Sequence, residues 1–320
     1  MGFDRRPLTP GDVGNWAALL TAIQDADGDD EYASEQDLRE RFEDPARDFA
    51  TSSIAVYDGP TLAGYGVLMC RGAADPVHDM LYMGGVHPSY RGRGLGGELL
   101  DWAEHAAAPL SHQRFPGHPL SLATGCPSTN AAAIALYEQR GYQPVRWFQE
   151  MVRDLSVPVP PPVTPAGVRI TAYRPDLAGH ALLVRNESFR DHWGSTQTSP
   201  EHWAHFLASA AFRPQFSFLA CEEPEPLGML IARESEAYHA HTGRRDVHIA
   251  LVGTRASARK RGIATALLLS TMAAARADGY DRASLDVDSD SLTGAVRLYE
   301  HLGFTVASTW ILYRKQLSEG

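Results

Sequence analysis

Apolar and polar positions along the chain change between a helical and a strand-like spacing, and they do so twice in the same order. An apolar stripe with helical spacing comes early in each half, at 11–24 (GDVGNWAALLTAIQ) and at 176–189 (DLAGHALLVRNESF). Two apolar runs about a turn with glycine or proline follow the stripe, at 52–70 and at 216–234. Such a pair of runs is typical of a β-hairpin.

Both halves continue with the same further elements. A strand leads through a basic loop into a helix at 86–106 (VHPSYRGRGLGGELLDWAEHA) and at 253–273 (GTRASARKRGIATALLLSTMA). A strand, a helix and a closing strand come last, at 121–145 and at 283–307. Repeats of this length are whole domains. Because hairpins precede the strand–helix crossover, we predict an α/β (α+β) fold of two tandem domains, each with a mixed, largely antiparallel sheet flanked by helices.

A proline-rich stretch near the middle of the chain separates the two repeats. Residues 154–167 read DLSVPVPPPVTPAG, and the prolines deny this segment a helix or a central strand. We therefore expect a stiff, extended linker here. The predicted domains are residues 1–153 and residues 168–320.

Composition and charge narrow the class of protein. The 320 residues are 44% hydrophobic and carry a net charge of −10, so the chain lacks the basic balance that nucleic acid favours. No apolar run is long enough to span a membrane, and three separated cysteines make no disulfide framework. We expect a reduced, cytoplasmic protein with no nucleic-acid or membrane partner. The sequence leaves the oligomeric state open.

The loop at 91–97 (RGRGLGG) suits a phosphate group, because it is rich in glycine and precedes a helix. Gly92, Gly94 and Gly97 have the spacing of the dinucleotide fingerprint, but the loop lies deep in the domain and lacks the acidic residue that a ribose needs. The matching loop at 259–264 (RKRGIA) drops that glycine spacing, and neither loop has the ending of a P-loop. Both nucleotide motifs are therefore excluded.

Both loops share the pattern Arg-x-x-Gly-x-Gly/Ala, which starts at Arg91 in the first half and at Arg259 in the second. Small residues let the backbone close around an anion, and the positive end of the following helix adds to the attraction. One copy alone could be an ordinary helix start with surface arginines. Two copies, each at a strand-to-helix turn, favour a pair of anion-binding loops.

Helices with matching apolar spacing follow in both halves. The first starts at Asn130 and carries Tyr137 before Gly141, and the second carries Tyr299 before Gly303. We expect each helix to pack on its sheet and to end at its glycine. On spacing alone, both tyrosines are aromatic residues of the core.

Together these motifs resemble those of the GNAT superfamily of acyl-CoA-dependent N-acyltransferases. The resemblance rests on Val-x-Pro-x-x-Arg-Gly-x-Gly-x-Gly, from Val86, and on Asn-x-x-Ala-x-x-Leu-Tyr-x-x-x-Gly-Tyr, from Asn130. As two tandem domains it covers nearly the whole chain. It implies an N-acetyltransferase that moves an acetyl or related acyl group from acetyl-CoA to the amine of a small molecule, by direct attack in a ternary complex.

The resemblance also implies which residues bind coenzyme A. The backbone of each loop would hold the pyrophosphate, and the pantetheine arm would lie where the preceding strand splays from its neighbour. Asn130 would bind this arm, and Ser291 or Asp290 lies at the matching place in the second half. The loop residues are Arg91, Gly92, Arg93, Gly94, Leu95, Gly96 and Gly97 in the first half, and Arg259, Lys260, Arg261, Gly262, Ile263 and Ala264 in the second.

Catalytic groups are implied in the same way. The backbone amides of Val86 and Thr254 would polarise the thioester carbonyl and stabilise its oxyanion. Tyr137 and Tyr299 would give a proton to the departing thiolate. The amine must lose a proton before it attacks, which calls for a general base. The candidate bases are Tyr82 and His87 in the first domain and Asp246 and His248 in the second. An ordinary surface or core role is the simpler interpretation of each candidate.

The two halves do not match the family equally well. Lys260 stands where the family has glycine, and the asparagine is missing from the second half. We therefore expect the first domain to bind the coenzyme, although tandem members of the family sometimes work through the C-terminal domain. The sequence does not decide which domain is catalytic.

The sequence says less about the acceptor than about the coenzyme. Carboxylates at 24–37 (QDADGDDEYASEQD) could attract a cationic amine, but a solvated loop explains them more simply. Asp191, His192 and Trp193 lie where the family builds acceptor walls, and a capped helix end explains them equally well. A mycothiol-synthase-like or antibiotic-modifying activity would differ only in its acceptor. A non-catalytic acyl-CoA-binding module is the alternative from another class.

Two further patterns are excluded as metal sites. Asp25, Asp27 and Asp29 begin like a calcium loop, but the glycine and the final glutamate of such a loop are missing. His239 and His241 have no carboxylate or thiol at metal spacing. We expect this pair of histidines to lie in an exposed loop, and we expect no metal.

Overall fold

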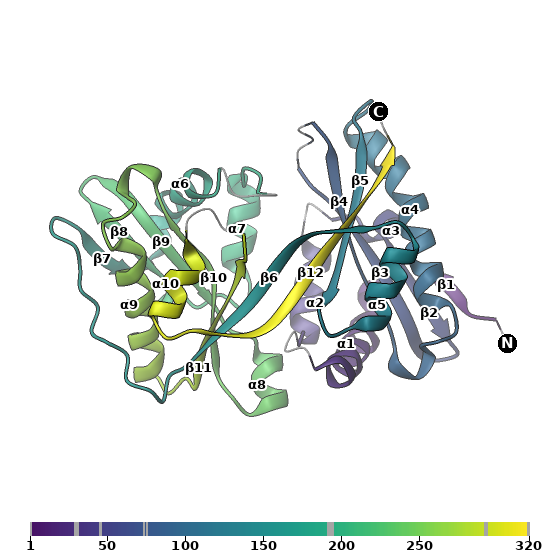
Figure 1. Ribbon diagram of the computed structural model, residues 1–320, viewed down its shortest axis with the longest axis horizontal. Helices are drawn as coiled ribbons and strands as arrows, with labels where there is room; N and C mark the ends of the chain where they lie inside the picture. Colours follow the sequence, from purple (N-terminus) through teal and green to yellow (C-terminus); the bar gives the residue numbers. More distant parts are fainter. Residues whose placement is uncertain are drawn as a thin grey trace. The chain divides into compact units, whose positions relative to one another are not determined.

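The computed structural model of the chain describes residues 2–28, 32–44, 47–72, 74, 76–190, 195–290 and 294–318. The chain divides into two compact units (Figure 1). Unit 1 comprises Met1–Phe148 with Ser308–Gly320, and unit 2 comprises Gln149–Ala307. Each unit has a sheet with helices on both faces, so the prediction of a mixed α/β fold is confirmed.

Unit 1 follows the predicted order of helix, hairpin, loop and helix. Its strands have the order β1-β2-β3-β4-β5-β12, and the neighbours pair in antiparallel fashion except β4 and β5, which are parallel. The strands are β1 (Asp4–Arg6), β2 (Ser53–Asp58), β3 (Thr61–Cys70), β4 (His78–Val86), β5 (Leu120–Pro127) and β12 (Thr305–Ser318). The helices are α1 (Val13–Asp27), α2 (Glu35–Glu43), α3 (Phe49–Ser52), α4 (Leu95–Arg114) and α5 (Ala131–Gln139).

Unit 2 repeats this plan. Its strands have the order β6-β11-β10-β9-β8-β7. The pair β10–β11 is parallel, and the pairs β10–β9, β9–β8 and β8–β7 are antiparallel. The strands are β6 (Gln143–Asp154), β7 (Arg169–Ala172), β8 (Phe218–Glu222), β9 (Glu225–Arg233), β10 (Asp246–Thr254) and β11 (Arg282–Asp288). The helices are α6 (Ala178–Ser188), α7 (Pro200–Ala208), α8 (Glu236–Thr242), α9 (Ile263–Ala277) and α10 (Ala295–His301).

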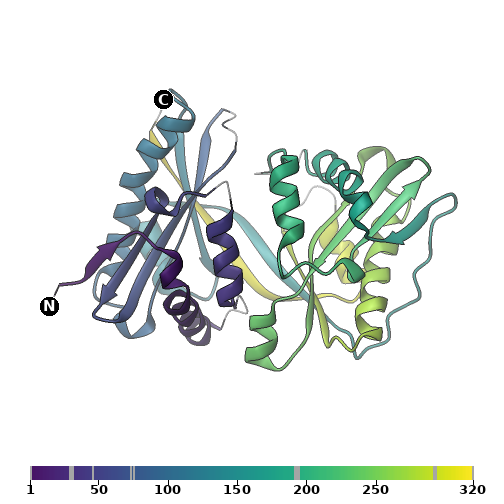
Figure 2. The same cartoon turned by 180° about the vertical axis from the view of Figure 1, so that it is seen from behind.

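The sheet of unit 1 is buried between two layers of helices. Helix α4 covers one face (Figure 1). There Leu95, Leu99 and Leu100 pack with Met80 and Tyr82 of β4. Each fully buried leucine contributes roughly 1.5–3 kcal/mol relative to an exposed one. On the other face α1 and α2 cover β2 and β3, as seen from behind in Figure 2. Strands β2 and β3 are therefore covered from both sides.

The sheet of unit 2 is covered in the same manner. Helix α9 packs on one face against Val247 and Ile249 of β10 and Leu285 of β11. Helices α6 and α7 pack on the opposite face, where Leu251 of β10 joins the cluster that contains Trp203. The alternation of β10 shifts by one residue at the irregularity between Ile249 and Leu251, so Leu251 points to the side opposite Val247 and Ile249.

The last strand of the chain belongs to unit 1. Strand β12 pairs with β5 from Trp310, opposite Pro127, to Ser318, opposite Leu120. In turn β6 begins in unit 1, and its residues from Gln149 onward belong to unit 2. The compact units therefore differ from the domain ranges predicted from the sequence. Residues 155–168 contain neither helix nor strand.

Candidate active site

The two basic loops have the same backbone conformation in the two units. In unit 1, Gly92 and Gly94 have φ angles of 73° and 87°. In unit 2, the φ angles of Lys260 and Gly262 are 63° and 81°. All four angles lie in the left-handed region. Each loop therefore makes the same tight turn directly before its helix, although the side chains differ.

Lys260 has a positive φ without being a glycine, and no other such residue occurs in the described ranges. The left-handed conformation costs a residue with a Cβ atom about 1–2 kcal/mol, whereas glycine adopts it freely. The lysine therefore keeps the turn but adds strain to it. Strain of this kind persists where the surrounding structure fixes the backbone, often at functional sites.

The turns present their backbone amides to solvent. Residues 91–94 and 259–262 are exposed, whereas Leu95 and Ile263, which begin α4 and α9, are buried. No side chain caps the start of either helix, so the first amides and the positive helix end face outward. A Cβ atom added at Gly92 would meet nothing within 4 Å. A pyrophosphate group fits both turns on these grounds.

The first arginine of each loop supports the turn from the side of the preceding strand. Arg91 Nε donates to the carbonyl of Val86 at 3.3 Å, and Arg259 Nε donates to the carbonyl of Thr254 at 3.4 Å. Arg259 Nη2 also donates to the carbonyl of Ser188, at 3.3 Å. These guanidinium groups hold the backbone of the loop in place. Because these two guanidinium groups already contact the backbone, the backbone amides of the loops are the groups that remain to bind an anion.

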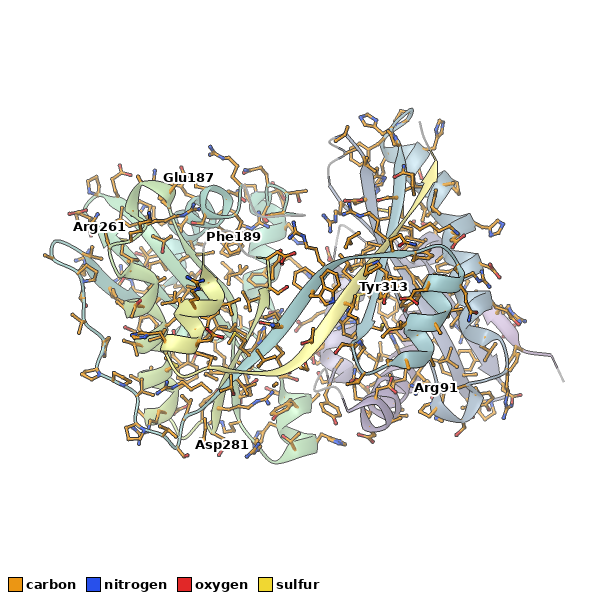
Figure 3. All side chains as sticks on the ribbon, in the orientation of Figure 1. Arg91, Glu187, Phe189, Arg261, Asp281 and Tyr313 are labelled. Carbon is orange, nitrogen blue, oxygen red and sulfur yellow. The ribbon has the colours of Figure 1, made fainter. Side chains whose placement is uncertain are left out.

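The second arginine of each loop stays close to the surface of its own unit. Arg93 donates to the carbonyl of Ser89 at 3.0 Å and lies over the ring of Tyr90. Arg261 forms an ion pair with Glu222 at 2.9 Å, and Figure 3 labels Arg261 on the ribbon. Both side chains are near enough to the turns to add positive charge there.

The strand before each loop separates from its parallel neighbour. Strands β4 and β5 pair from His78 to Leu81, which lies opposite Ala123, and the pairing stops there. Strands β10 and β11 pair from Asp246 to His248, which lies opposite Ser284. The rest of both parallel pairs forms an open wedge. The splay that the family resemblance implied is therefore present in both units.

The amides of Val86 and Thr254 lie on the open side of their wedges. His87 N donates to Ala63 of β3, and Arg255 N donates to Leu227 of β9. Successive amides of a strand point to opposite sides, so the preceding amide in each unit points away from that partner and into the wedge. By the same alternation the amides of Gly84 and Val252 also point there. The sequence analysis named one amide per unit and missed this row of donors.

Tyr137 and Tyr299 occupy matching, buried places at the ends of α5 and α10. Each accepts a backbone hydrogen bond at its carbonyl from five residues on, Tyr142 N in one case and Phe304 N in the other, both at 3.0 Å. Gly141 in unit 1 has a φ of 81°, which this helix ending requires. The two tyrosines are thereby held in fixed positions.

The hydroxyl of Tyr137 reaches the wedge of unit 1. It lies 3.3 Å from Thr124 Oγ1, and it donates to the carbonyl of Gly125 at 3.3 Å. The ring of Tyr313, labelled in Figure 3, lies 5.5 Å from the ring of Tyr137. Burial raises the pKa of Tyr137 and that of Tyr299 to about 12, so both hydroxyls keep their protons at neutral pH.

Comparison with known proteins decides the family. Residues 50–144 match the acetyltransferase (GNAT) domain, and residues 183–304 match the acetyltransferase (GNAT) family. The mycothiol acetyltransferase of Thermobispora bispora is 32% identical over 315 residues, which cover 96% of this chain and 97% of that protein. The chain belongs to the GNAT acetyltransferase family. The mycothiol acetyltransferase of Salinispora arenicola is 30% identical over 96% of this chain and 94% of that protein.

Solved structures agree with this GNAT assignment. A GCN5-related N-acetyltransferase from Sphaerobacter thermophilus has a TM-score of 0.78 and 28% identity, and the match covers 99% of this chain and 96% of that one. A tandem GNAT protein from the clavulanic acid biosynthesis pathway has a TM-score of 0.73 and 15% identity, with 99% of both chains covered. The second similarity shows the fold alone. The tandem arrangement of two GNAT domains is confirmed.

The GNAT assignment establishes the class of reaction. The chain is an acyltransferase that uses acetyl-CoA as donor and an amine of a small molecule as acceptor. The alternative of a non-catalytic acyl-CoA-binding module is not favoured. Among the residues that the structure describes, no helix is long and apolar enough to cross a membrane.

Asn130 has a local structural role in addition to the one that the resemblance implied. Its Oδ1 accepts from Ala133 N at 3.0 Å and so caps α5, while its Nδ2 donates to Asp27 at 3.3 Å. Asp27 also binds Arg91 through both carboxylate oxygens, at 2.7 and 3.0 Å. One carboxylate thus joins the two sides of the wedge mouth in unit 1. The sequence analysis placed Asp27 in an acidic loop and missed this contact.

Several of the predicted acceptor and coenzyme residues lie outside the described residues. These are Ser291, the cluster from Asp191 to Trp193, and residues 29–31 of the acidic stretch. Asp25 and Asp27 belong to the last turns of α1. Asp290 N donates to Asp288 Oδ1 at 2.9 Å, directly after β11.

The four candidate bases differ sharply in their surroundings. Tyr82 is buried against α4, and burial raises its pKa well above the ordinary value, so it is unsuited to accept a proton. His87 caps the short turn after β4, where its Nδ1 accepts from Ser89 N at 3.2 Å. Asp246 and His248 lie together on β10, at the closed end of the wedge of unit 2.

His239 and His241 are exposed but belong to helix α8 instead of a loop, because Ser235 caps a short helix there. No group of three or more metal-ligating side chains occurs in the described part of the chain. Burial raises the pKa of Cys126 to about 11, which keeps the thiol protonated and unreactive.

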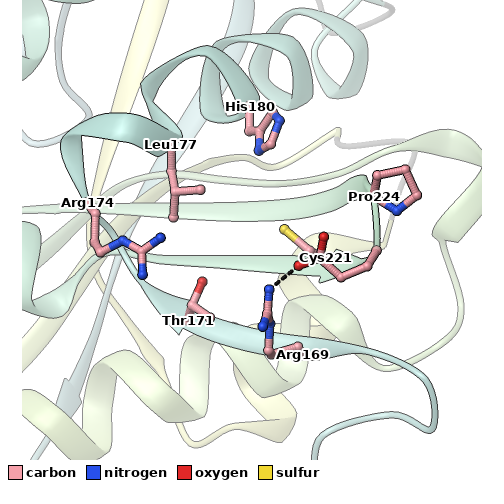
Figure 4. A pocket seen from close by; sticks show the side chains of 8 residues that line it. Arg169, Thr171, Arg174, Leu177, His180, Cys221 and Pro224 are labelled. Carbon is pink, nitrogen blue, oxygen red and sulfur yellow. Dashed lines mark hydrogen bonds and ion pairs between the residues drawn. The ribbon is translucent and has the colours of Figure 1, made fainter.

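Unit 2 also has a pocket at the outer edge of its sheet, away from β10 and β11 in the strand order. Figure 4 shows Arg169 of β7 pointing into it, in an ion pair with Glu223. Arg174, His180 and Cys221 also line this pocket. Because β7 and β8 are the outermost strands of the sheet, the pocket lies apart from the wedge between β10 and β11.

Proposed function

We propose that the acceptor of this GNAT acetyltransferase is a mycothiol-related small molecule, namely an amine whose acetylation yields mycothiol or a close relative. The supporting observation is that the similarity to mycothiol acetyltransferases runs along both units. The relatives from T. bispora and S. arenicola each align with 96% of the chain. A relationship through a single shared domain would cover only about half of it.

In this proposal the coenzyme is bound by the two turns and wedges described above. Acetyl-CoA supplies the acyl group as a thioester. The amides of residues 91–97 and 259–264 bind its pyrophosphate, and the open amides of β4 and β10 orient the thioester carbonyl. Val86 and Thr254 belong to these rows of amides. Asn130 binds the pantetheine arm in unit 1 once its contact with Asp27 is released.

The two tyrosines serve as proton donors in this proposal. A hydroxyl with a pKa of about 12 keeps its proton at neutral pH, so Tyr137 Oη and Tyr299 Oη each hold a proton that a leaving thiolate can take. The hydroxyl of Tyr137 already reaches the wedge of its unit. A phenylalanine at either position would keep the packing and remove the proton.

The acceptor is tested by incubating the purified protein with acetyl-CoA and the des-acetyl form of mycothiol. Mass spectrometry reads out the acetylated product, since the acceptor carries a thiol that would disturb a thiol-release assay. A panel of amino sugars and aminoglycosides serves for comparison. We expect product from the mycothiol precursor at a kcat/KM at least tenfold above that of any panel amine. Preference for a panel amine would contradict the proposed acceptor.

A further inference from the structure

A chain of polar side chains lies on β10 and β11 of unit 2, at the point where these strands separate. Asp246, His248 and Ser284 point away from α9, because the alternate residues Val247 and Ile249 pack in the α9 core. His248 and Ser284 form the last pair of the parallel register. The wedge that opens beyond them is where the thioester lies in the proposed function.

The hydrogen bonds of this chain have a direction. Ser284 Oγ donates to Asp246 Oδ2 at 2.6 Å. Burial raises the pKa of Asp246, whereas the guanidinium of Arg282, whose Nε lies 3.4 Å from Asp246 Oδ1, opposes this shift and favours the carboxylate form. The single proton of the Ser284 hydroxyl is therefore donated to Asp246. His248 Nδ1 lies 3.0 Å from Ser284 Oγ, so the histidine must be the donor in that contact. The neutral imidazole then has its lone pair at Nε2.

We propose that Asp246 and Ser284 hold His248 in the Nδ1–H tautomer, so that Nε2 acts as the general base for the acceptor amine in unit 2. This role rests on the proposed function. The amine nitrogen bonds to the acyl carbon as the thioester C–S bond breaks. Its proton passes to His248 Nε2, and the departing sulfur takes the proton of Tyr299. Ser284 and Asp246 are positioning residues, since they act through His248.

The position of His248 suits this role. Its side chain is 35% exposed, whereas Asp246 is almost fully buried. The exposed carboxylate of Asp286 lies 3.8 Å from His248 Nε2 and adds negative charge where a cationic amine would approach. The ring is thus anchored at one nitrogen and accessible at the other. A tautomer fixed by a buried acceptor is the arrangement that general-base histidines need.

Unit 1 provides a natural comparison at the equivalent positions. The last residues of its parallel register on the same face are Asp79, opposite Ser121, and Leu81, opposite Ala123. Asp79 accepts from Ser121 and pairs with Arg314 at 2.9 Å, so the carboxylate is kept. Ser121 stands at the register position of Arg282, while Leu81 and Ala123 stand at those of His248 and Ser284. Unit 1 therefore lacks the relay, and its Ser121 is a matched control.

The tautomer is tested without any substrate. Protein labelled with ¹⁵N-histidine is measured by long-range ¹H–¹⁵N correlation at about pH 8, where an imidazole is mostly neutral, and the variant His248→Gln assigns the signal. We expect the Nδ1–H pattern in the wild type, the Nε2–H pattern in Ser284→Ala, and return of the Nδ1–H pattern in Ser284→Thr. Ser121→Ala should leave the signal unchanged. An Nε2–H tautomer in the wild type would overturn the proposal.

Kinetics with acetyl-CoA and the best acceptor test the base role. We expect His248→Gln to lower kcat/KM by about 100-fold or more, as loss of a general base does, and Ser284→Ala to lower it about tenfold, mainly in kcat. Ser284→Thr and Ser121→Ala should stay within twofold of the wild type. If Ser284→Ala changes the tautomer but not kcat, the positioning role is wrong. If no amine is acetylated by the wild type, the base role fails with the proposed function, while the spectrum still decides the tautomer.

Discussion

At the scale of single residues, the clearest lesson concerns the two turns that precede α4 and α9. The same pair of left-handed positions occurs in both, but one of the four is a lysine. The backbone shape, more than the side chains, is therefore what the two loops share. That shape can be tested by exchanging glycine for alanine, because alanine adds only a Cβ atom.

We expect Gly92→Ala to lower the free energy of unfolding of unit 1 by about 1–2 kcal/mol. Its φ of 73° is unfavourable for alanine, although the added methyl group would touch nothing. Gly179→Ala is the matched control, since this helical glycine also has open space around it and an ordinary φ. The control should raise stability by about 0.5–1 kcal/mol. Urea denaturation measures the change in the free energy of unfolding of both variants. If both variants change stability in the same direction, the turn at Gly92 is not strained by a Cβ atom.

The buried tyrosines make stability depend on alkaline pH. Burial raises the pKa of Tyr137 and that of Tyr299 from about 10 in the unfolded chain to about 12 in the fold. The folded state therefore holds protons that the unfolded state has lost, and this stability is complete below about pH 10 and lost as the pH rises to about 12. Between pH 8 and about pH 11, each tyrosine should account for a loss of about 1 kcal/mol.

The variant Tyr299→Phe tests this dependence. Its free energy of unfolding should fall by about 1 kcal/mol less than that of the wild type between pH 8 and about pH 11, because phenylalanine cannot ionise. Denaturant titrations at a series of pH values give the comparison. If the free energy of unfolding falls equally with pH in the two proteins, the hydroxyl of Tyr299 is hydrated in the folded state.

Residue-level chemistry was only partly predictable from the sequence. The arginine and glycine spacing predicted both turns, since a short local motif determines them. The roles of Asp27 and Ser284 could not be foreseen, because each depends on partners brought together by the fold. Asp27 meets Arg91 and Asn130 from distant parts of the chain. Ser284 meets His248 only through the register of two parallel strands.

At the scale of elements, each wedge depends on how closely a helix approaches the sheet. Gly228 of β9 lies under Ile263, the first residue of α9, and a Cβ atom there would come within 2.7 Å of the isoleucine Cγ2. The matching Gly64 of β3 has more room, with 3.2 Å to Leu99. The start of α9 is thus packed directly on the strand beside the phosphate-binding turn.

We expect Gly228→Ala to push the start of α9 outward, with a loss of roughly 1–3 kcal/mol in the stability of unit 2 and weaker binding of acetyl-CoA there. Calorimetric titration with acetyl-CoA and chemical denaturation measure the two effects. Gly64→Ala is the matched variant in unit 1 and should cost less. If Gly228→Ala binds acetyl-CoA as tightly as the wild type, the position of the start of α9 does not determine coenzyme binding in unit 2.

The elements themselves were largely predictable, because each half shows clear helical and strand spacing. Among the described helices, the pattern did not predict α2, α3, α7 and α8. In α8, His239 and His241 were expected in a loop. Its seven residues are too few to show an apolar period, and a serine cap with buried Tyr238 holds the helix in place. Short elements of this kind are fixed by contacts instead of by their pattern.

At the scale of the whole molecule, the two units cannot be cut apart at the linker. Residues from Ser308 onward complete the sheet of unit 1, where β12 covers the outer edge of β5. The sequence could not predict this, because the hydrophobic alternation of β12 fits any sheet edge of the right length. The proline-rich stretch lies between the two GNAT matches, but the compact units do not divide there.

A chain truncated after Ala307 should lose stability in unit 1, although the deleted residues follow unit 2 in the sequence. Without β12 the strand β5 has a free edge, and Tyr137 loses the ring of Tyr313 that packs against it. Hydrogen exchange should show faster exchange of the β5 amides than of the β11 amides. The fragment 1–153 should likewise exchange rapidly in β5. Wild-type protection of β5 in either protein would contradict the role of β12.

The place of β12 also bears on how the protein forms on the ribosome. Most of unit 1 is synthesised by the time β6 emerges, yet the strand that closes its sheet is translated only after unit 2. At about 5–20 residues per second, the edge of β5 stays open for roughly ten seconds or more. Termination at any point before β12 would therefore leave the sheet of unit 1 unfinished as well.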